Sequence, residues 1–366
     1  MKPIRVITPG FDLKAEIDNY ESMMYTRSWH GIGQLELRIN KYKKHVEHLL
    51  KGNLVMVGPK KVFLIKHREI ELDENGKATE NWLIKAPQLK VITGQRITIP
   101  PSTTAYDNKQ GNAETVMKHY VDRNIVNPVD TNRKISQLSL ATNQNRGPAV
   151  SWQSRFKNLA EDLANISLVS GIGWDITLDI VNKKWALDVA AGRDLTVNQS
   201  SLPPVIFSPQ FESIQSISYL DSDLNYKNTA YVGGQGEGIN REVITIGTDI
   251  GLSRHEIFID ARDSENTQTL TDRGNQELQS FLQEQYLEGQ ILTRSTFKYE
   301  KDYELGDIVT VQNKGWGVTL DARITEIKET YETSGYRIEA VFGNNRPTLI
   351  KKIKQELAQI SGEVRK

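Results

Sequence analysis

Residues 303–311, YELGDIVTV, are one copy of a short pattern that occurs twice in this chain. Residues 49–57, LLKGNLVMV, repeat its design: in each stretch a Leu and a Gly precede a small polar residue, and alternating aliphatic residues follow. Aliphatic residues at every second position are typical of a strand with one buried face. The two stretches therefore predict one strand in each of two similar β units.

The segments that follow the two stretches also correspond. Each stretch is followed by a strand with a basic residue and a Glu-Ile pair, then a glycine turn, then a strand that ends in Lys-Ala or Glu-Ala. These are HREIEL (67–72), Gly76 and WLIKA (82–86) in the first copy, and ITEIKE (324–329), Gly335 and YRIEA (336–340) in the second. Ordinary hairpin sequences could produce this likeness; the alternative is two related barrels in one chain. Two such barrels per chain, assembled as a cyclic trimer, would form a ring with approximate six-fold symmetry.

The periodicity along the whole chain predicts an α+β fold rich in β-structure. It comprises two related small β-barrel domains and an α+β domain between them. In the first barrel, QLELRIN places Leu35, Leu37 and Ile39 on one face of a strand. The predicted boundaries are 1–101 for the N-terminal barrel, 102–213 for the middle domain, 214–346 for the second barrel region with an inserted helix at about 265–288, and 347–366 for a C-terminal helix.

Helices are predicted where apolar residues recur three or four positions apart. One helix begins after Ser151, a candidate N-cap, and stops at Gly171. Its predicted apolar face comprises Trp152, Phe156, Leu159, Leu163 and Ile166, while an earlier helix buries Val116, Tyr120 and Val121, and the inserted helix buries Leu270, Leu278, Leu282 and Tyr286. The C-terminal helix carries a seam of coiled-coil width, a candidate contact with other copies or with a partner, formed by Ile350, Ile353, Leu357 and Ile360.

Composition excludes several classes of protein. Among 366 residues, 46 Lys and Arg balance 46 Asp and Glu, so no basic excess favours a nucleic-acid or membrane-surface binder. There is no cysteine, which excludes disulfides, thiolate metal sites and a cysteine nucleophile. The N-terminus does not read as a signal peptide, and no run of apolar residues is long enough to span a membrane. We expect a protein that is made in a cytoplasm and does not insert into membranes.

The glycine cluster YVGGQGEGINRE, residues 231–242, is not a phosphate-binding loop. It lacks the G-x-G-x-x-G spacing and the G-K-[ST] ending of such loops. The segment that follows, REVITI, alternates like a strand and does not open a helix. We therefore interpret the cluster as a connection between two strands.

No catalytic, cofactor-binding or metal site is predicted. The cluster His45, Glu47 and His48 matches neither H-E-x-x-H nor H-x-x-E-H, and without a further ligand in view it is interpreted as a solvated polar surface. A G-x-S-x-G motif is absent. The acids of FIDARDSE, which are Asp260, Asp263 and Glu265, lie at a strand-to-helix transition, where acids commonly form caps and turns.

Tryptophans are distributed over the whole chain. Trp316, in KGWGV, is a candidate hairpin-tip residue, and an exposed aromatic side chain at a loop tip indicates a possible contact surface. Core packing is the prediction for Trp82, Trp152, Trp174 and Trp185.

The order of these features resembles a known family. SWHGIGQLELRI, RFKNLAEDL with GIGWDI, AGRDLT, PPVIFS, YKNTAYVGGQGEG, GLSRHEIFIDARD, YELGDIVTV and VFGNNRPTL follow one another along residues 20–350. This series is similar to the siphovirus ReqiPepy-type, Gp37-like, phage tail proteins of phages and prophages of Gram-positive bacteria. The resemblance implies a structural virion protein of the baseplate hub or tail tip, without enzymatic activity or cofactors, with the two-barrel fold of the contractile-tail hub and a homotrimeric assembly.

The resemblance also implies a place and partners. The protein would lie at the distal tail tip, close the tail tube, contact a distal tail protein and tube or tape-measure components, and connect them to a receptor-binding protein or fibres. It would open on host attachment for DNA ejection, so that genomic DNA passes only in transit. Two other functions remain open: a cell-wall hydrolase or endopeptidase of the tail, and a carbohydrate-binding tail adhesin that would use Trp316.

Overall fold

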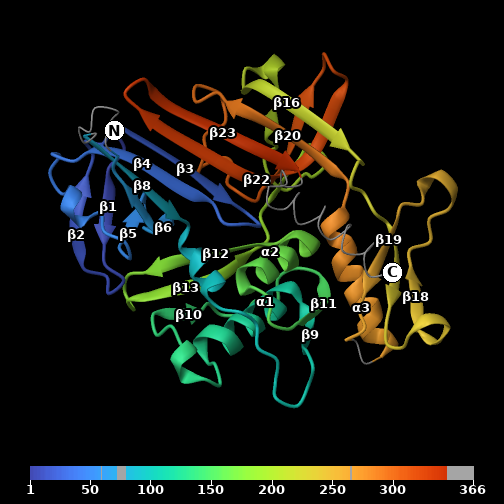
Figure 1. The fold of residues 1–366 in the computed structure, drawn as a ribbon. Helices are drawn as coiled ribbons and strands as arrows, with labels where there is room; N and C mark the ends of the chain where they lie inside the picture. The colour runs from blue at the N-terminus through green and yellow to red at the C-terminus, as the bar shows by residue number, and fades with distance from the viewer. Residues whose placement is uncertain (59, 72–79, 264–265, 344–366) are drawn as a thin grey trace.

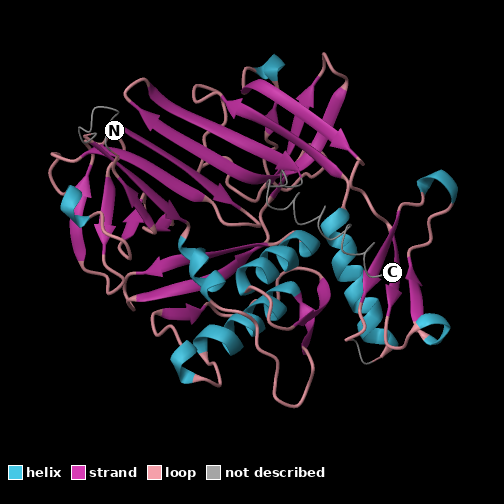
Figure 2. Cartoon of the chain, viewed as in Figure 1, coloured by secondary structure: helices cyan, strands magenta, loops and turns pink. Residues whose placement is uncertain are grey.

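The computed structural model describes residues 1–58, 60–71, 80–263 and 266–343 (Figure 1). Three features predicted from the sequence lie outside these ranges: the Gly76 turn, Glu265, and the C-terminal helix with Ile350, Ile353, Leu357 and Ile360. Within the described residues, no helix is both long and apolar enough to cross a membrane. Figure 2 shows that strands dominate the structure and that the longer helices gather below the largest sheet in this view.

The largest sheet has 11 strands, eight of which form one continuous antiparallel path. Off this path, β21 (Ile308–Asn313) pairs with β22 and carries two short parallel partners, β14 (Asp194–Leu195) and β15 (Ile206–Phe207). The strands of the path, in spatial order, are β16 (Ile214–Ser222), β20 (Glu284–Ile291), β23 (Gly335–Gly343), β22 (Val318–Glu332), β3 (Ser22–Ser28), β4 (Gln34–Asn40), β8 (Asn81–Pro87) and β7 (His67–Glu69).

The path consists of the same four-strand arrangement twice. We call β3, β4, β8 and β7 the first unit, and β16, β20, β23 and β22 the second unit. When the strands of each unit are numbered 1 to 4 along the chain, their order across the sheet is 1-2-4-3 in both units. The repeat seen in the sequence is thus present in the sheet. The units are joined by the β22–β3 pair, and no closed barrel is formed by strand pairing among the described residues.

The strand pairing aligns the third strands of the two units, β7 and β22, four residues away from the alignment that the sequence motifs suggest. Lys85 of β8 pairs with His67, and Glu339, the equivalent residue of β23, pairs with Lys328. His67 therefore corresponds to Lys328, although the motif comparison aligned it with Ile324. The reason is the length of β22. Its first half pairs with β21 as β6 (Val62–Leu64) pairs with β5 (Leu54–Met56), and its second half pairs with β23 as β7 pairs with β8.

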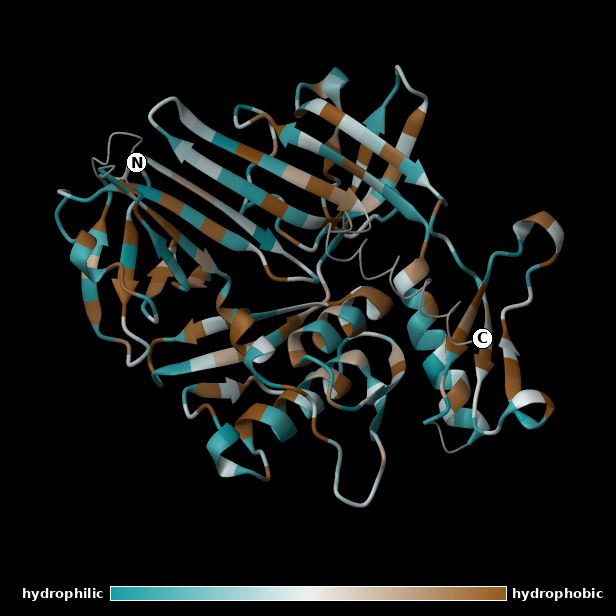
Figure 3. Cartoon of the chain, in the orientation of Figure 1, coloured by the Kyte–Doolittle hydropathy of each residue, from teal (hydrophilic) through white to brown (hydrophobic). Residues whose placement is uncertain are grey.

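Strand alternation places one face of each unit on a hydrophobic core. Leu35, Leu37 and Ile39 are fully buried, which confirms the prediction for β4. A separate sheet covers the first unit with further apolar residues; its order is β2 (Leu13–Ile17), β1 (Ile4–Ile7), β5 and β6. Figure 3 shows the alternation of hydrophobic and hydrophilic residues along the strands of the large sheet. The other face of the large sheet is polar.

The middle domain contains two helices against short sheets. Asn112 and Asn158 cap α1 (Ala113–Val121) and α2 (Leu159–Ser170) through their side-chain oxygens. Val116, Tyr120 and Val121 are buried as predicted, and Gly171 ends α2 in the left-handed conformation. The strands are β9 (Asp107–Asn112), β10 (Leu138–Leu140), β11 (Ala149–Ser154), β12 (Gly173–Asp179) and β13 (Lys184–Ala190).

The predicted start of the second helix was wrong. Residues 149–154 pair with β9 along their whole length, so Ser151 and Trp152 lie in strand β11. Phe156 has a positive φ of 51° and an exposed side chain, which separates the strand from the helix. Leu159, Leu163 and Ile166 form the buried face of the helix as predicted. Among the tryptophans predicted to pack in the core, three are buried and one is partly buried: Trp152, Trp174 and Trp185, and Trp82.

A small unit is inserted between β16 and β20. Helix α3 (Thr267–Leu278) covers a sheet of β17 (Thr229–Gly233), β18 (Val243–Ile246) and β19 (Glu256–Asp260). The glycine cluster is the β17–β18 hairpin loop, as predicted. Gly236 has a φ of 94°, and a methyl group there would approach the Asn240 carbonyl oxygen to 2.5 Å. The predicted end of α3 was wrong because residues from Glu284 pair with β16 and β23, which places Tyr286 in β20.

Candidate assembly surface

The pairing of β22 with β3, which joins the two units, shows how the edge strands of the sheet could pair with another copy of the chain. Seven antiparallel pairs, from Glu326 with Ser28 to Glu332 with Ser22, connect β22 of the second unit to β3 of the first. The path ends at β7, which is equivalent to β22, and at β16, which is equivalent to β3. Among the described residues, one chain thus contains one complete joint and the two halves of another, neither of which has a strand partner at its outer edge. Unpaired strand edges are templates for pairing with a further strand.

A buried ion pair lies at the joint. The Lys61 Nζ atom is 2.5 Å from Glu329 Oε1 and 3.1 Å from the Tyr25 hydroxyl, and the side chains of Lys61 and Glu329 are only 3% and 2% exposed. Tyr331 and Tyr336 donate their hydroxyl hydrogens to Glu329 Oε2 at 2.8 and 3.1 Å. Burial alone would raise the pKa of the Glu329 carboxyl, but the Lys61 ammonium and these hydrogen bonds hold it below its usual value.

A second polar link crosses the same joint. Arg27 of β3 donates to the Tyr299 hydroxyl and to Glu304 Oε1, each at 3.0 Å, from a site where its own side chain is 10% exposed. Tyr299 and Glu304 belong to the connection between β20 and β21 of the second unit. The two units are therefore connected by charged side chains as well as by backbone pairing.

Trp29 fixes the units to the middle domain. Its Nε1 atom donates to the Gly171 carbonyl at 3.0 Å, and its ring lies against Gly306 and Gly173. A methyl group at either glycine would come within 2.1 or 2.3 Å of the ring. Gly306 is the glycine of YELGDIVTV, so the repeated motif lies at the contact between units and middle domain.

The polar face of the large sheet carries charges of both signs. Lys328 and Glu339 form a 2.8 Å ion pair across β22 and β23, and Arg38 lies 3.6 Å from Glu36 on β4. A groove of 480 Å³ crosses the second unit on this face. It is lined by Thr26, Ser216, Glu288, Gly289, Gln290, Glu326, Lys328, Glu339, Ala340 and Val341. Three glutamates and one lysine, Lys328, line this groove, so the formal charge of its lining is negative.

The acids considered for catalysis are engaged in ion pairs. Asp260 accepts from Arg241 at 2.6 Å and from Arg262 at 2.8 Å. The hydrogen bond from Arg262, followed by that from Arg241, outweighs burial and lowers the pKa of Asp260. Asp263 lies 3.3 Å from Arg273 of α3. These contacts stabilise the small inserted unit.

One buried Ser-His contact connects two domains. His30 Nδ1 lies 2.6 Å from the Ser167 Oγ atom on α2. The Ser167 hydroxyl donates its hydrogen to the Ile172 carbonyl oxygen in the same buried environment. Because the hydroxyl hydrogen is directed at a carbonyl and away from the imidazole, this pair is arranged for packing and not for nucleophilic attack.

The predicted contact residues are only partly described. Trp316 lies in the turn between β21 and β22 and is 52% exposed, so its place at a hairpin tip is confirmed, while its role as a contact stays a prediction. Lys61 and Glu329 were not among the residues predicted from the sequence. One signal was present: Ile327, Glu329 and Tyr331 alternate onto one face, which places a carboxylate among core residues.

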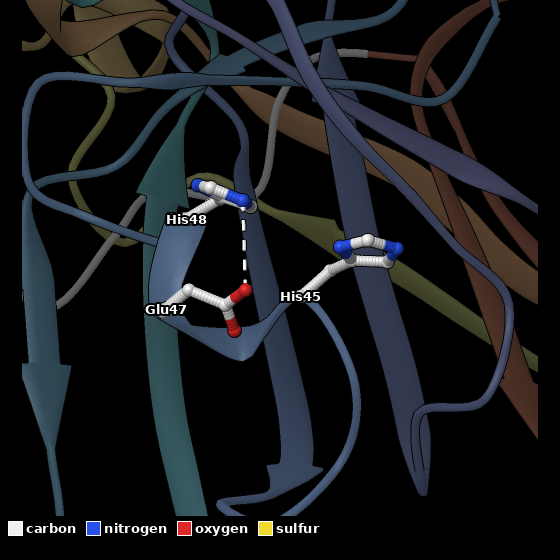
Figure 4. A group of neighbouring side chains, drawn as sticks. All are labelled: His45, Glu47 and His48. Atoms are coloured by element: carbon white, nitrogen blue, oxygen red, sulfur yellow. Dashed lines mark ion pairs between the residues drawn. The ribbon is translucent and has the colours of Figure 1, made fainter.

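The predicted histidine cluster is brought together by the fold. Residues 46–48 form a single turn of 3-10 helix at the end of the loop after β4. The ligand atoms of His45, Glu47 and His48 all lie within 4.8 Å of one another (Figure 4).

Comparison with known proteins identifies the family. A family model described as "Siphovirus ReqiPepy6 Gp37-like protein" matches residues 3–344. The chain belongs to this family. Its membership confirms the resemblance inferred from the order of the sequence motifs. No curated protein matches the sequence of this Gp37-like chain.

Solved structures of tail proteins, two of them from prophages, share the fold described above. The 43 kDa tail protein of prophage MuSo2 from Shewanella oneidensis has a TM-score of 0.56 at 13% identity, and the alignment covers 93% of this chain and 98% of that one. The tail protein from Neisseria meningitidis MC58 has a TM-score of 0.54 at 12% identity, covering 93% and 95%. Prophage tail protein gp18 from Listeria monocytogenes EGD-e has a TM-score of 0.53 at 14% identity, covering 98% and 100%. The Gp37-like chain is thus a β-rich protein with the fold of phage tail proteins.

Proposed function

We propose that this protein is the trimeric hub of the phage tail tip, which closes the tail tube and opens for DNA ejection. The observation that carries the proposal is the head-to-tail order of the two units, whose outer edges at β7 and β16 have no strand partner within the part of the chain that the structure describes. Strand β16 of one copy would pair with β7 of the next, as β3 pairs with β22 within the chain. Three copies with two units each would form a ring of six similar units.

Such a ring fits a six-fold tube on one side and three-fold components on the other. The tube side would contact a distal tail protein, the tail tube or tape-measure components. The opposite side would contact a receptor-binding protein or fibres, for which Trp316 and the C-terminal seam of Ile350, Ile353, Leu357 and Ile360 are candidate surfaces. The protein would be made in the host cytoplasm and act at the distal tail tip of the virion.

The polar face of the sheet is the proposed wall of the lumen. Its ion pairs, such as Lys328 with Glu339, leave little net positive charge to retain a phosphate backbone. Genomic DNA would therefore pass without being bound. The apolar cores on the other face, which include Leu37 and Ile338, would keep the wall rigid.

Cysteine cross-linking tests the ring at residue resolution, because the natural chain has no cysteine. The register of the internal joint pairs Thr330 with Met24, and the equivalent residues of the free edges are Glu69 and Gln215. Antiparallel partners lie about 4.5–5.5 Å apart between Cα atoms, within the range of a disulfide. In tails assembled with the double variant E69C/Q215C, we expect a covalent trimer on a gel without reductant.

The control variant E69C/T245C moves the second cysteine to β18, the edge of the small sheet, and should stay uncross-linked. A chain that remains monomeric by light scattering with its tail partners present, and fails to cross-link in assembled tails, would contradict the ring.

The proposal also holds that the protein is not a cell-wall hydrolase. Asp260 and Asp263 are paired with arginines and serve the fold of the small unit. In zymograms on cell-wall material we expect no clearing by the purified protein. Clearing that disappears in Asp260→Ala or Asp263→Ala would instead establish an enzyme.

A further inference from the structure

The turn that holds His45, Glu47 and His48 has an anchored backbone, and its three polar side chains contact one another. Val46 and Leu49 are buried and anchor the turn to the core of the first unit. Asn53 donates from Nδ2 to the His48 carbonyl oxygen at 2.9 Å, and the His48 N–H donates to the His45 carbonyl at 3.1 Å. The backbone is therefore defined from both ends, while the three polar side chains extend from it (Figure 4).

The geometry of this turn brings the two imidazoles together. His45 directly precedes the 3-10 turn of Val46–His48, and His48 ends it. Their ring centroids are 6.0 Å apart with an interplanar angle of 25°. His45 has a φ of 74°, a left-handed conformation that is uncommon for a residue with a side chain. The Glu47 carboxylate lies 3.5 Å from His48 Nε2 and supplies the third donor.

We propose that His45, Glu47 and His48 form a binding site for a divalent transition-metal ion of the zinc class. Two imidazole nitrogens and one carboxylate oxygen are a common set of protein ligands for zinc, with the fourth position left to water or to a side chain of another molecule. Ligand atoms around a tetrahedral zinc ion lie roughly 3.3 Å apart. The three donors lie within 4.8 Å of one another, and the Glu47 side chain, which is 66% exposed, has room to rotate toward this spacing.

Neighbouring positive charges limit the affinity of this site for a metal ion. Lys43 and Lys44 precede His45 in sequence, and their positive charge opposes a bare cation. We therefore expect micromolar and not nanomolar affinity for zinc. The inference rests on this turn alone and is independent of the proposed role in the tail.

Zinc binding to the full chain, measured by isothermal titration calorimetry, tests the site. We expect one zinc ion per chain, and at least about tenfold weaker binding in each of H45A, E47Q and H48A, since loss even of groups outside the ligand set costs about 10–100-fold in metal sites. Cobalt(II) in place of zinc should show the visible absorption of a tetrahedral site in the natural protein and lose it in H48A.

The matched control is H67A. His67 and Glu69 form another exposed His-Glu pair, at 2.9 Å, but belong to no group of three donors among the described residues. H67A should bind zinc like the natural protein. Absence of saturable binding below about 1 mM, equal affinity of the natural protein and H48A, or an equal loss in H67A would each overturn the proposal. Circular dichroism of the variants, whose changes are at the surface, separates lost binding from lost folding.

Discussion

Replacing Lys61 with methionine should lower the free energy of unfolding by about 3–5 kcal/mol, the range measured when one partner of a buried ion pair is removed. The Glu329 carboxylate would stay buried at the joint between the units without its cation. Two tyrosine hydroxyls would still donate to one of its oxygens, but they carry no charge. Urea unfolding followed by tryptophan fluorescence measures the loss.

Two variants distinguish this effect from a general loss of lysine. Lys328→Met removes an ion pair of similar length whose side chains are 37% and 43% exposed, and should cost less than about 1 kcal/mol. The double variant K61M/E329Q removes the unpaired charge and should recover part of the loss. If K61M and K328M cost the same, the ion pair at the joint contributes no more than a surface pair.

The K61M penalty should also depend on pH. In the natural protein the pKa of Glu329 is lowered, so its stabilising contribution is present above the pKa of the unfolded chain and is lost as the pH falls through the folded value. Without Lys61, burial raises the pKa of this carboxyl, and a protonated carboxyl is less costly to bury. The difference between K61M and the natural protein should therefore shrink between pH 7 and about pH 5.

Replacing Gly306 with alanine should destabilise the protein through two separate effects. Gly306 has a φ of 95°, and a non-glycine residue in such a conformation costs about 1–3 kcal/mol. The added methyl group would also approach the Trp29 ring to 2.1 Å. The ring cannot move aside freely, because Gly173 lies against it and Nε1 is bonded to the Gly171 carbonyl. Overpacking of this kind costs a further 1–3 kcal/mol or so.

The repeat supplies the matched control for this variant. Gly52 stands in LLKGNLVMV where Gly306 stands in YELGDIVTV, and its φ is 94°. No atom lies within 4 Å of a methyl group added at Gly52. G52A should therefore show only the backbone cost, and the difference between the two variants in thermal or urea unfolding measures the contact with Trp29. Equal losses would mean that the Trp29 contact adds nothing.

Local features of the fold were predictable from the sequence. The burial of Leu35, Leu37 and Ile39, the helix stop at Gly171 and the hairpin loop at the glycine cluster all follow from interactions between residues close in sequence. The helix boundaries were less predictable. Ser151 and Tyr286 have apolar neighbours at helical spacing, yet both lie in strands because β9, β16 and β23 offer them backbone partners. Pairing with distant strands overrides a local period.

In the candidate metal site, too, the residue cluster was visible in the sequence, but its geometry depends on contacts between distant segments. His45, Glu47 and His48 were visible as a cluster, but whether their donors meet depends on the left-handed backbone of His45 and on the buried residues that anchor the turn. Lys61 and Glu329 are 268 residues apart and meet only because β22 pairs with β3.

The sequence alone indicated two similar β units on either side of a helical segment, because period-two alternation and glycine turns are properties of short segments. Only the tertiary structure decided how the units meet. The β22–β3 pairing, its buried charges and the free edges at β7 and β16 depend on contacts between segments hundreds of residues apart. No local periodicity specifies such contacts, because every strand edge offers the same backbone donors and acceptors. Side-chain packing and charge at the β22–β3 joint select the partner strand.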